Sequence, residues 1–425
     1  MSGSKIDKKR AAVVGAGAVG ACCAAYLQRD GHDVVVLDPD GFGRGCSEGT
    51  VGIFATNIIA PASSAGGVKA MLTAAQNPDL DTLMINKEFL SEFLPWMASF
   101  VATSGPLSFA LGREALKEAQ RLSIPALRAI LDKDVFDEHV KERGWISAYE
   151  SEASFKAGKA DRDVRKQHGI AVEELDEKQL KSIEPSLPEK LKFATLFPRE
   201  YHTANVNKFI AAIGDVALRN GAVLKQRSVD HIEPQDDGTF HVHAGGEIVH
   251  VDVVVIAAGA YSAKLAAELG SPVLHCAERG YGVTFENADV GLNTPVTLAQ
   301  NKCVIAPMEA GLHVISSGEF APIDTQPDER HQDRLISIAQ DLYPELVGKT
   351  VTRWSGWRST VPDGLPVIDE SPVHKGVFYA FGHSHLGLTQ AGLSGAIISA
   401  LAGGREPVMN NTPFKIDRFS LTPTY

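Results

Sequence analysis

Residues 11–40 decide the fold of this chain and read AAVVGAGAVGACCAAYLQRDGHDVVVLDPD. Two apolar runs flank a glycine turn and a stretch whose apolar residues recur every three to four positions, which is the spacing of a helix face. Gly31 follows that stretch, where a helix end favours left-handed backbone. Continuously apolar strands are typical of parallel sheets because both faces are buried. The stretch therefore predicts a strand, a helix and a strand of an α/β domain.

The glycine turn predicts a dinucleotide-binding site. Gly15 permits the tight turn, Gly17 lets the backbone approach a pyrophosphate, and Gly20 allows close helix packing. Asp38 ends the second strand, where its carboxylate can accept hydrogen bonds from ribose hydroxyls and would repel the 2′-phosphate of NADP. The residues expected at the cofactor are Gly15, Ala16, Gly17, Ala18, Val19, Gly20 and Asp38. The turn does not distinguish FAD from NAD, and an ordinary glycine turn is the structural alternative.

The composition is typical of a folded globular protein. Hydrophobic residues make up 44% and charged residues 22% of the 425 residues, and the net charge of −11 disfavours binding to nucleic-acid backbones. Five cysteines without a CxxC pair indicate neither a disulfide framework nor a zinc ribbon and favour a reducing compartment. No run approaches the ~20 apolar residues of a membrane span, and residues 1–10 are expected to form a short solvated tail. We expect a cytoplasmic location, with peripheral contact at the inner face of the membrane left open.

The remaining chain is expected to add helices and a second sheet. Residues 41–67 have no clear period and predict an ordered loop, whereas residues 79–143 predict mostly helix. A further helix is expected over 206–219. Between 273 and 354, short apolar runs alternate with one helix near 330–342, a pattern typical of a separate antiparallel sheet.

Five separated segments carry a resemblance to a known family. They are VVGAGAVG with Asp38, DVVVIAAGAYS at 252–262, ERGY at 278–281, GWRSTVPDGLPVID at 356–369 and YAFGHSHLGLTQAGLSG at 379–395. Together they resemble the D-amino-acid oxidase superfamily of FAD-dependent amine oxidoreductases, which includes glycine oxidase, sarcosine oxidase and, most similar here, the bacterial D-amino-acid dehydrogenases. The resemblance implies an α/β fold with a discontinuous Rossmann-like FAD domain, formed by residues 1–90, 200–270 and 355–425. It also implies a substrate domain of an antiparallel sheet plus helices, formed by residues 91–199 and 271–354.

The resemblance further implies that FAD is the cofactor and is bound noncovalently. Covalent members carry a cysteine near the segment GWRSTVPDG, which contains none here, and the nearest cysteine is Cys303. Small residues at a strand end let the chain pass beside a cofactor, and a helix expected from 386 to 400 would direct its N-terminal amides at the flavin, where negative charge builds on reduction. Packing alone is the alternative for both features. The residues added to the FAD site are Ser47, Ala258, Gly259, Gly382, His383, Leu386, Gly387, Leu388 and Thr389.

The resemblance implies three catalytic residues. Arg358 matches the arginine of a G-x-R pattern that binds the substrate carboxylate, a task that suits a planar guanidinium, although Ser359 stands where several members have proline. A surface salt bridge is the alternative for Arg358. Tyr281 is expected either to contact substrate or to be a buried strand tyrosine. His383, and His385 beside it in GHSH, are expected either to accept a proton from the substrate ammonium or to have a packing or flavin-positioning role. We expect no metal site.

The expected activity is FAD-dependent oxidative deamination of D-amino acids, including cyclic ones such as D-proline derivatives. A hydride passes from Cα to flavin N5, and the imine hydrolyses to a 2-oxo acid and ammonium. One alternative is a glycine or sarcosine oxidase-like protein that uses oxygen. Another is a noncatalytic flavin-binding redox sensor, and an NAD-dependent dehydrogenase is a weaker one. The electron acceptor, either oxygen or a quinone or electron-transfer partner, stays open.

Overall fold

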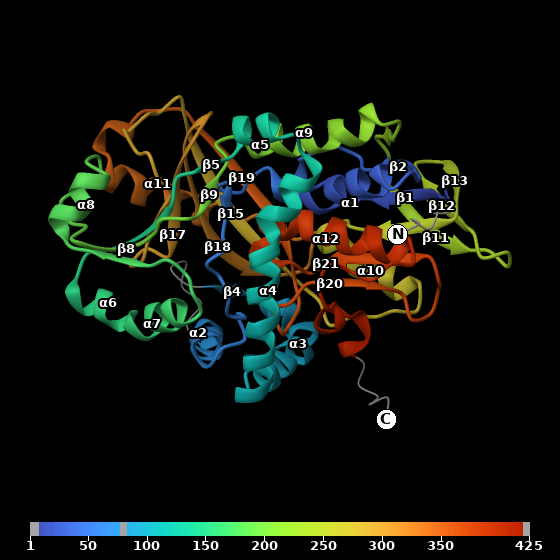
Figure 1. Ribbon diagram of the computed structural model, residues 1–425. Coiled ribbons are helices and arrows are strands. Elements are labelled where there is room, and N and C mark those ends of the chain that lie inside the picture. Colours follow the sequence, from blue (N-terminus) through green and yellow to red (C-terminus); the bar gives the residue numbers. More distant parts are fainter. Residues whose placement is uncertain (1–7, 77–82, 420–425) are drawn as a thin grey trace.

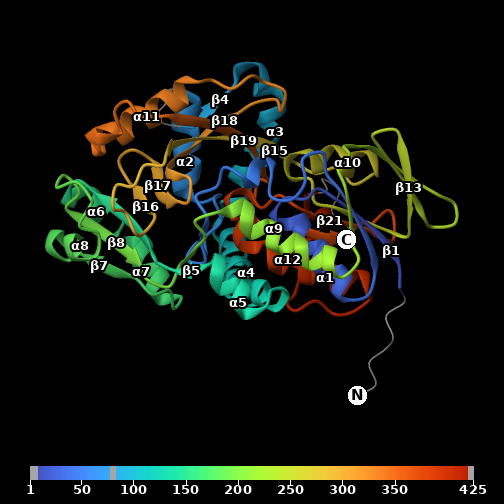
Figure 2. The same ribbon diagram turned by 90° about the horizontal axis from the view of Figure 1, so that it is seen from above.

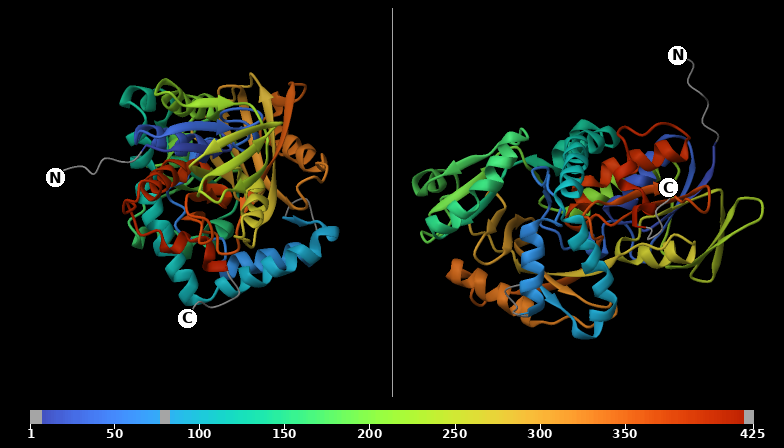
Figure 3. Two further views of the ribbon diagram at one scale, coloured as in Figure 1. Left: turned by 90° about the vertical axis from the view of Figure 1, so that its right-hand side faces the viewer. Right: turned by 90° about the horizontal axis from the view of Figure 1, so that it is seen from below.

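A computed structural model describes residues 8–76 and 83–419 (Figure 1). Residues 1–7 of the expected tail and residues 79–82 of the predicted helical stretch lie outside these ranges. The described chain is elongated. Figures 1 and 3 show a three-stranded meander at one end and, at the other, the helices α6 (Glu152–Ala157), α7 (Lys159–Gln167) and α8 (Glu177–Ile183).

The predicted strand, helix and strand lie at the centre of a parallel sheet. They are β1 (Arg10–Val14), α1 (Ala18–Arg29) and β2 (Asp33–Leu37), and Gly31 has a φ of +93°. Among the described residues the sheet has six strands in the order β10-β2-β1-β14-β21-β20, and only β20 is antiparallel to its neighbour. The added strands are β10 (Val223–Lys225), β14 (Val253–Ile256), β20 (Val367–Glu370) and β21 (Val377–Phe381). Segments far apart in the sequence therefore build one nucleotide-binding sheet.

Alternate residues of the central strands face two different layers. Val13 and Val255 are buried against a layer of helices, and Val14 and Ile256 are buried against the meander and a short helix. The helix layer includes α1, α9 (Val206–Arg219) and α12 (Gly387–Ala402). The other layer consists of β11 (Val229–Pro234), β12 (Phe240–Ala244), β13 (Glu247–Val251) and α10 (Ser262–Glu268). Burial on both faces explains why the quoted strands are continuously apolar.

The predicted second sheet is confirmed, and the described part of it has nine strands. Its order is β19-β15-β18-β17-β16-β6-β8-β7, with β4 beside β18. The pairs are antiparallel except β16 with β6 and β18 with β4. The predicted helix α11 (Arg330–Leu342) lies along this sheet (Figure 2). The strands are β4 (Met84–Ile85), β6 (Trp145–Tyr149), β7 (Glu173–Leu175), β8 (Phe193–Phe197), β15 (Cys276–Glu286), β16 (Val296–Leu298), β17 (Cys303–Met308), β18 (Gly311–Phe320) and β19 (Val351–Thr360).

Two elements pack across the expected domain boundaries. Helix α4 (Pro106–Ile130) falls in the segment expected in the substrate domain, yet its buried side chains join the core around β1. The cause is close helix packing, since a Cβ on Gly392 of α12 would lie 2.7 Å from the backbone nitrogen of Leu127 in α4. Conversely, β4 falls in the segment expected in the FAD domain but pairs with β18 of the second sheet. The boundaries themselves stay a prediction.

The described segments that connect the two sheets contain the remaining helices and three short strands. The predicted loop 41–67 contains the 3-10 turn η1 (Gly45–Ser47) and β3 (Ile53–Phe54), and it ends in α2 (Ala65–Gln76). The predicted helical stretch includes α3 (Leu90–Thr103), α4 and α5 (Lys133–His139). The remaining strands are β5 (Lys141–Glu142) and β9 (Tyr201–His202), which pair with each other, and β9 also pairs with β3. Within the described ranges, no helix has the length and apolarity needed to cross a membrane.

Candidate functional site

The glycine turn closes tightly against the end of β14. Gly15 has a φ of +103°, and a Cβ built there would lie 2.5 Å from the carbonyl oxygen of Ala257. A Cβ on Gly20 would overlap the carbonyl oxygen of Gly15. Larger residues at these two positions would force β1, α1 and β14 apart. The turn thus has the close approach that the glycine pattern predicts.

The first turn of α1 presents backbone donors without competing acid groups. Gly17 is the N-cap, and the first turn carries no acidic side chain. The first N–H groups of a helix have no partner inside the helix, so they are available to an anion. Ser47 of η1 reaches this point, and its Oγ accepts a hydrogen bond from the Ala18 N–H at 3.2 Å. The predicted Ala16 and Val19 belong to the same turn. These features fit the pyrophosphate of a dinucleotide.

Asp38 lies just beyond β2 and fixes the loops around the turn. Its Oδ2 accepts a hydrogen bond from the Ala16 N–H at 2.8 Å. Its Oδ1 accepts hydrogen bonds from the N–H groups of Asp40 and Gly41, both at 2.9 Å. The carboxylate therefore stands beside the start of α1, as a ribose-binding residue of a dinucleotide site must.

Three short turns converge on strand β19. Contacts link β19 with η1, with η3 (Gly259–Tyr261) and with η5 (Ser384–Leu386). Gly259 and Gly382 have positive φ values of +56° and +79°, backbone conformations that favour glycine. The N–H of Gly382 donates to Ser359 Oγ at 3.0 Å. The predicted residues at Ala258, Gly259, Gly382 and Leu386 are thus brought near the strand that carries Arg358.

The start of α12 is held rigidly beside the loop 41–67. The helix begins at Gly387, directly after η5, and Leu388 and Thr389 in its first turn are buried. Thr389 Oγ1 accepts a hydrogen bond from the Ala55 N–H at 2.9 Å. A fixed helix N-terminus is a stabiliser for negative charge, because its dipoles are already oriented.

His383 is buried at the start of this segment and bonds to α12. Its Nε2 lies 2.7 Å from Ser394 Oγ. Burial lowers the pKa of His383 to about 3, so the ring stays neutral at the pH of most cells. The hydrogen bond fixes η5 against α12. This geometry favours the alternative expectation, a positioning role.

Arg358 points from β19 toward the nucleotide-binding sheet and is paired. Its Nη1 donates to Glu278 Oε1 at 3.0 Å, and its Nη2 donates to the Ser316 carbonyl oxygen at 3.4 Å. The two charged side chains are only 10% and 6% exposed, so the expected alternative of a surface salt bridge is wrong. His385 Nε2 lies 3.4 Å from the same Glu278 oxygen. Gly280 leaves room for this arrangement, since a Cβ there would overlap the guanidinium.

The face of the sheet that carries Arg358 contacts the loop after β2. Residues directly opposite in antiparallel strands share a face, which groups Arg358 with Glu278 and Trp354 with Gly282. A Cβ on Gly49 would overlap the Trp354 ring. The opposing loop therefore covers this face, and Arg358 lies between the second sheet and the elements that form the glycine-turn site.

Tyr281 lies on the opposite face of the sheet from Arg358. Its side chain is fully buried, and its hydroxyl donates to Glu319 Oε2 at 2.9 Å and accepts from the Asp328 N–H at 3.0 Å. Its ring stacks on His331 of α11 at a centroid distance of 4.4 Å. The expected substrate contact is therefore not supported, and Tyr281 is the buried strand tyrosine of the alternative.

Glu278 is the site residue that the sequence patterns do not single out, whereas His385 belongs with His383 to the GHSH segment expected near the flavin. Both lie within quoted motifs, Glu278 in ERGY and His385 in GHSH. Strand alternation places positions 278 and 281 on opposite faces, so only one of the two side chains can share the face of Arg358. Their closeness to Arg358 depends on strand register.

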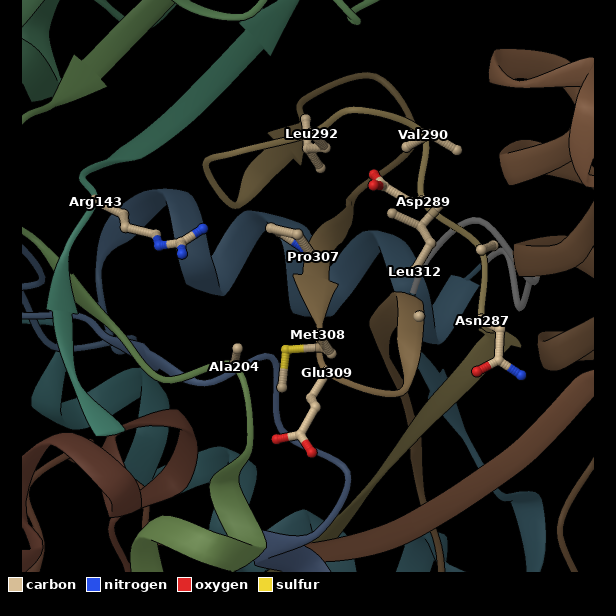
Figure 4. Close-up of a pocket in the computed structure, with 12 residues that line it drawn as sticks. Arg143, Ala204, Asn287, Asp289, Val290, Leu292, Pro307, Met308, Glu309 and Leu312 are labelled. Atoms are coloured by element: carbon tan, nitrogen blue, oxygen red, sulfur yellow. The ribbon is translucent and has the colours of Figure 1, made fainter. Parts of the chain in front are cut away.

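Metal binding has no support in the described part of the chain, where no group of three His, Cys, Asp or Glu side chains could hold an ion. A separate cavity has a volume of about 560 Å³. Figure 4 shows the residues that line it. Arg143, Met308 and Glu309 line it, and it contains none of the predicted site residues. Glu309 is already bonded there to Lys208 and Asn205.

Comparisons with known proteins agree with this fold. The profile of the family described as "FAD dependent oxidoreductase" matches residues 10–401. A D-amino-acid oxidase from Bradyrhizobium diazoefficiens is 28% identical over 97% of this chain and 99% of its own. The crystal structure of glycine oxidase from Geobacillus kaustophilus has a TM-score of 0.73 at 23% identity, covering 97% of this chain and 99% of that one. Iminodiacetate oxidase from Chelativorans sp. BNC1 has a TM-score of 0.68 at 18% identity, covering 96% and 98%. With the glycine turn, Asp38 and the fixed start of α12 in place, the chain belongs to the DAO family of FAD-dependent oxidoreductases.

Proposed function

We propose that the protein oxidises D-amino acids at the Cα–N bond. The observation that carries the proposal is the buried guanidinium of Arg358, which lies on the sheet face covered by the loop that carries Ser47, and Ser47 contacts the start of α1. An arginine in this position suits a carboxylate, because its planar N–H groups match the two oxygens. The name of the full-length relative, a D-amino-acid oxidase, supports the substrate class.

The residues that would hold FAD are those of the glycine turn, Ser47, Asp38 and the turns at 258–259 and 382–389. When bound, FAD supplies the electron acceptor for the Cα–H bond. Arg358 binds the substrate carboxylate and so fixes the position of Cα, which provides most of what such a site must contribute. The start of α12 stabilises negative charge, and the opposing loop around Gly49 keeps water from the face of the sheet. The imine released hydrolyses to a 2-oxo acid and ammonium.

The test is an anaerobic absorbance titration of the purified flavoprotein. D-amino acids, L-amino acids, D-proline, glycine and sarcosine are added one at a time. Bleaching of the flavin by D-enantiomers and not by L-enantiomers is the expected result. Bleaching by glycine or sarcosine alone would replace the proposal with a small-amine oxidase. A bound flavin that no amino acid bleaches would contradict the enzyme proposal and leave the redox sensor.

We also propose peripheral contact with a lipid bilayer and a cytoplasmic location. Residues 93–112 contain no Asp, Glu, Lys or Arg, and one side of this segment of α3 and α4 is exposed while Phe93, Trp96 and Phe100 are buried. These two helices meet in a short turn at the edge of the molecule (Figure 1). The exposed side chains on them include Leu90, Leu94, Val101, Leu107 and Leu111. Such a patch on a protruding hairpin suits insertion among lipid headgroups, and a membrane quinone would then be near as an electron acceptor.

A further inference from the structure

Glu278 is a buried charged side chain that contacts the proposed carboxylate-binding arginine. We propose that Glu278 binds the ammonium group of the substrate, so that Glu278 and Arg358 together select zwitterions over simple carboxylates. The inference rests on the proposed function, because it assumes that Arg358 receives an amino-acid carboxylate. It restricts the substrate of that site to molecules that carry both a carboxylate and an ammonium group.

The pair is built into the sheet. Glu278 of β15 and Arg358 of β19 are directly opposite, so their side chains leave the sheet on the same face. The distance between Nη1 of Arg358 and Oε1 of Glu278 is 3.0 Å. Glycine at 280 and at 356 gives the guanidinium and the Trp354 ring their space. The two charges therefore occupy fixed positions rather than flexible ones.

Arg358 keeps N–H donors that a substrate carboxylate can engage. A guanidinium carries five N–H donors, and the described residues engage two of them, through Glu278 and the Ser316 carbonyl. A substrate carboxylate would bond to further donors of Arg358. In an amino acid the ammonium group and the carboxylate are bonded to the same Cα and lie only a few ångströms apart. Glu278 and Arg358 are similarly close, since their charged groups are 3.0 Å apart. Each group of the zwitterion would then meet the opposite charge.

The same arrangement disfavours ligands that carry only a carboxylate. The charges of Arg358 and Glu278 sum to zero, so a lone anion gains the attraction of one and meets the repulsion of the other. Both side chains are almost fully buried. Buried charges are screened less by water and salt than exposed ones, so the attraction and the repulsion are both strong here. His385 is 49% exposed and lies 3.4 Å from the same carboxylate oxygen, so it helps to orient Glu278 from the solvent side.

A purely structural role for Glu278 makes a different prediction. If Glu278 only held Arg358 in place, its loss would weaken all carboxylate ligands alike. If Glu278 binds the ammonium group, its loss weakens amino acids and strengthens carboxylates that lack the amine. The opposite signs separate the two roles.

The experiment uses the holoenzyme and the variant Glu278→Gln, with D-alanine and its deamino analogue propanoate as the ligand pair. Anaerobic rapid mixing gives the Kd of D-alanine from the rate of flavin reduction, and absorbance titration gives the Kd of propanoate. In the variant we expect the Kd of D-alanine to rise about tenfold or more and that of propanoate to fall, because a hydrogen bond to a charged group is lost in the first case and a repulsion in the second. Glu286→Gln, on the same strand and face but near its exposed end, is the control and should change neither.

Several results would overturn the inference. If the Kd values of D-alanine and propanoate rise equally in Glu278→Gln, Glu278 has a structural role. If neither Kd changes, Glu278 does not contact the ligand. Should Glu278→Gln not fold, the wild-type protein still provides a test, since propanoate binding as tightly as D-alanine contradicts the proposal. If D-alanine reduces the flavin but Glu278→Gln has the same ratio of the two Kd values as the wild type, only the role of Glu278 is overturned. If no amino acid reduces the wild-type flavin, the proposed function itself fails.

Discussion

Arg358 and Glu278 stand directly opposite each other on β19 and β15, and their charged groups meet 3.0 Å apart on the face that looks toward the glycine-turn site. Eighty residues separate them in the chain. The antiparallel register of two long strands brings them together. Under the proposed function, this pairing makes the second sheet part of the substrate site rather than a scaffold beside it.

Replacing Arg358 by alanine should remove substrate binding without removing the cofactor. We expect kcat/KM for a D-amino acid to fall about 100-fold or more, since a charge-assisted bidentate contact is lost, while Arg358→Lys retains part of the activity. Steady-state kinetics and the flavin absorbance per mole of protein measure the two effects. Arg353→Ala, on the same strand but bonded to Asp333 of α11, is the matched control. Unchanged kinetics in Arg358→Ala would remove the arginine from the mechanism.

Gly20→Ala should abolish FAD binding. The added methyl group would overlap the carbonyl oxygen of Gly15 and open the contact between α1 and the turn. The flavin content of the purified variant, read from its visible absorbance, measures the effect. Gly66→Ala is the control, because its nearest neighbouring atom, Ser64 Oγ, would lie 3.8 Å from the new Cβ. Full flavin content in Gly20→Ala would mean that the cofactor does not use this turn.

Tyr281→Phe should reduce stability and leave catalysis intact. The variant loses the hydroxyl that bonds to Glu319 and to the Asp328 N–H in a buried place, a loss of about 1–3 kcal/mol in the free energy of unfolding. Urea denaturation gives the stability, and KM for the best substrate gives the second readout. A large rise in KM at unchanged stability would restore the substrate contact expected from the sequence.

Acid should destabilise the protein through its buried histidines. Burial lowers the pKa of His275 to about 4, below the ~6.5 of an unfolded histidine, so the unfolded chain takes up the proton first as the pH falls. The stability from the neutral ring is complete above about pH 6.5 and is lost as the pH falls toward 4. His202 and His383 act in the same direction.

The Tm between pH 7 and pH 5 measures this effect. We expect a fall in wild type and a smaller fall in His275→Gln, whose amide can still bond to Ser359 Oγ. His250→Gln, at an exposed position of β13, should follow the wild type. Parallel curves for wild type and His275→Gln would show that this ring does not titrate as burial implies.

The exposed leucines of α3 and α4 should govern membrane binding. Leu94 is 56% and Leu107 is 74% exposed, so charging them should cost little folding energy. We expect Leu94→Glu and Leu107→Glu to reduce cosedimentation with phosphatidylcholine vesicles at least severalfold, because a charged group opposes insertion. Ile248→Glu, on the distant hairpin of β13, is the control. Absence of wild-type protein from the vesicle pellet would contradict the membrane proposal.

The sequence by itself determined the local parts of this protein. Residues 11–40 specify the strand, the glycine turn and the helix, because hydrophobic period and glycine conformation act over a few residues. Asp38 follows from the same stretch, and the α11 bounds follow from helical spacing. The motif around Arg358 identified the arginine but not its partner.

Only the tertiary structure decided which side chains share a face and a layer. The pairing of Arg358 with Glu278, and the placement of Tyr281 against α11 instead, depend on strand register, which a local pattern does not encode. The packing of α4 on α12 depends on glycines in one helix and apolar side chains in another, more than 250 residues apart. Sequence patterns reflect the local conformational preference of each segment. The site depends on charge pairing and close packing between segments that are distant in the chain.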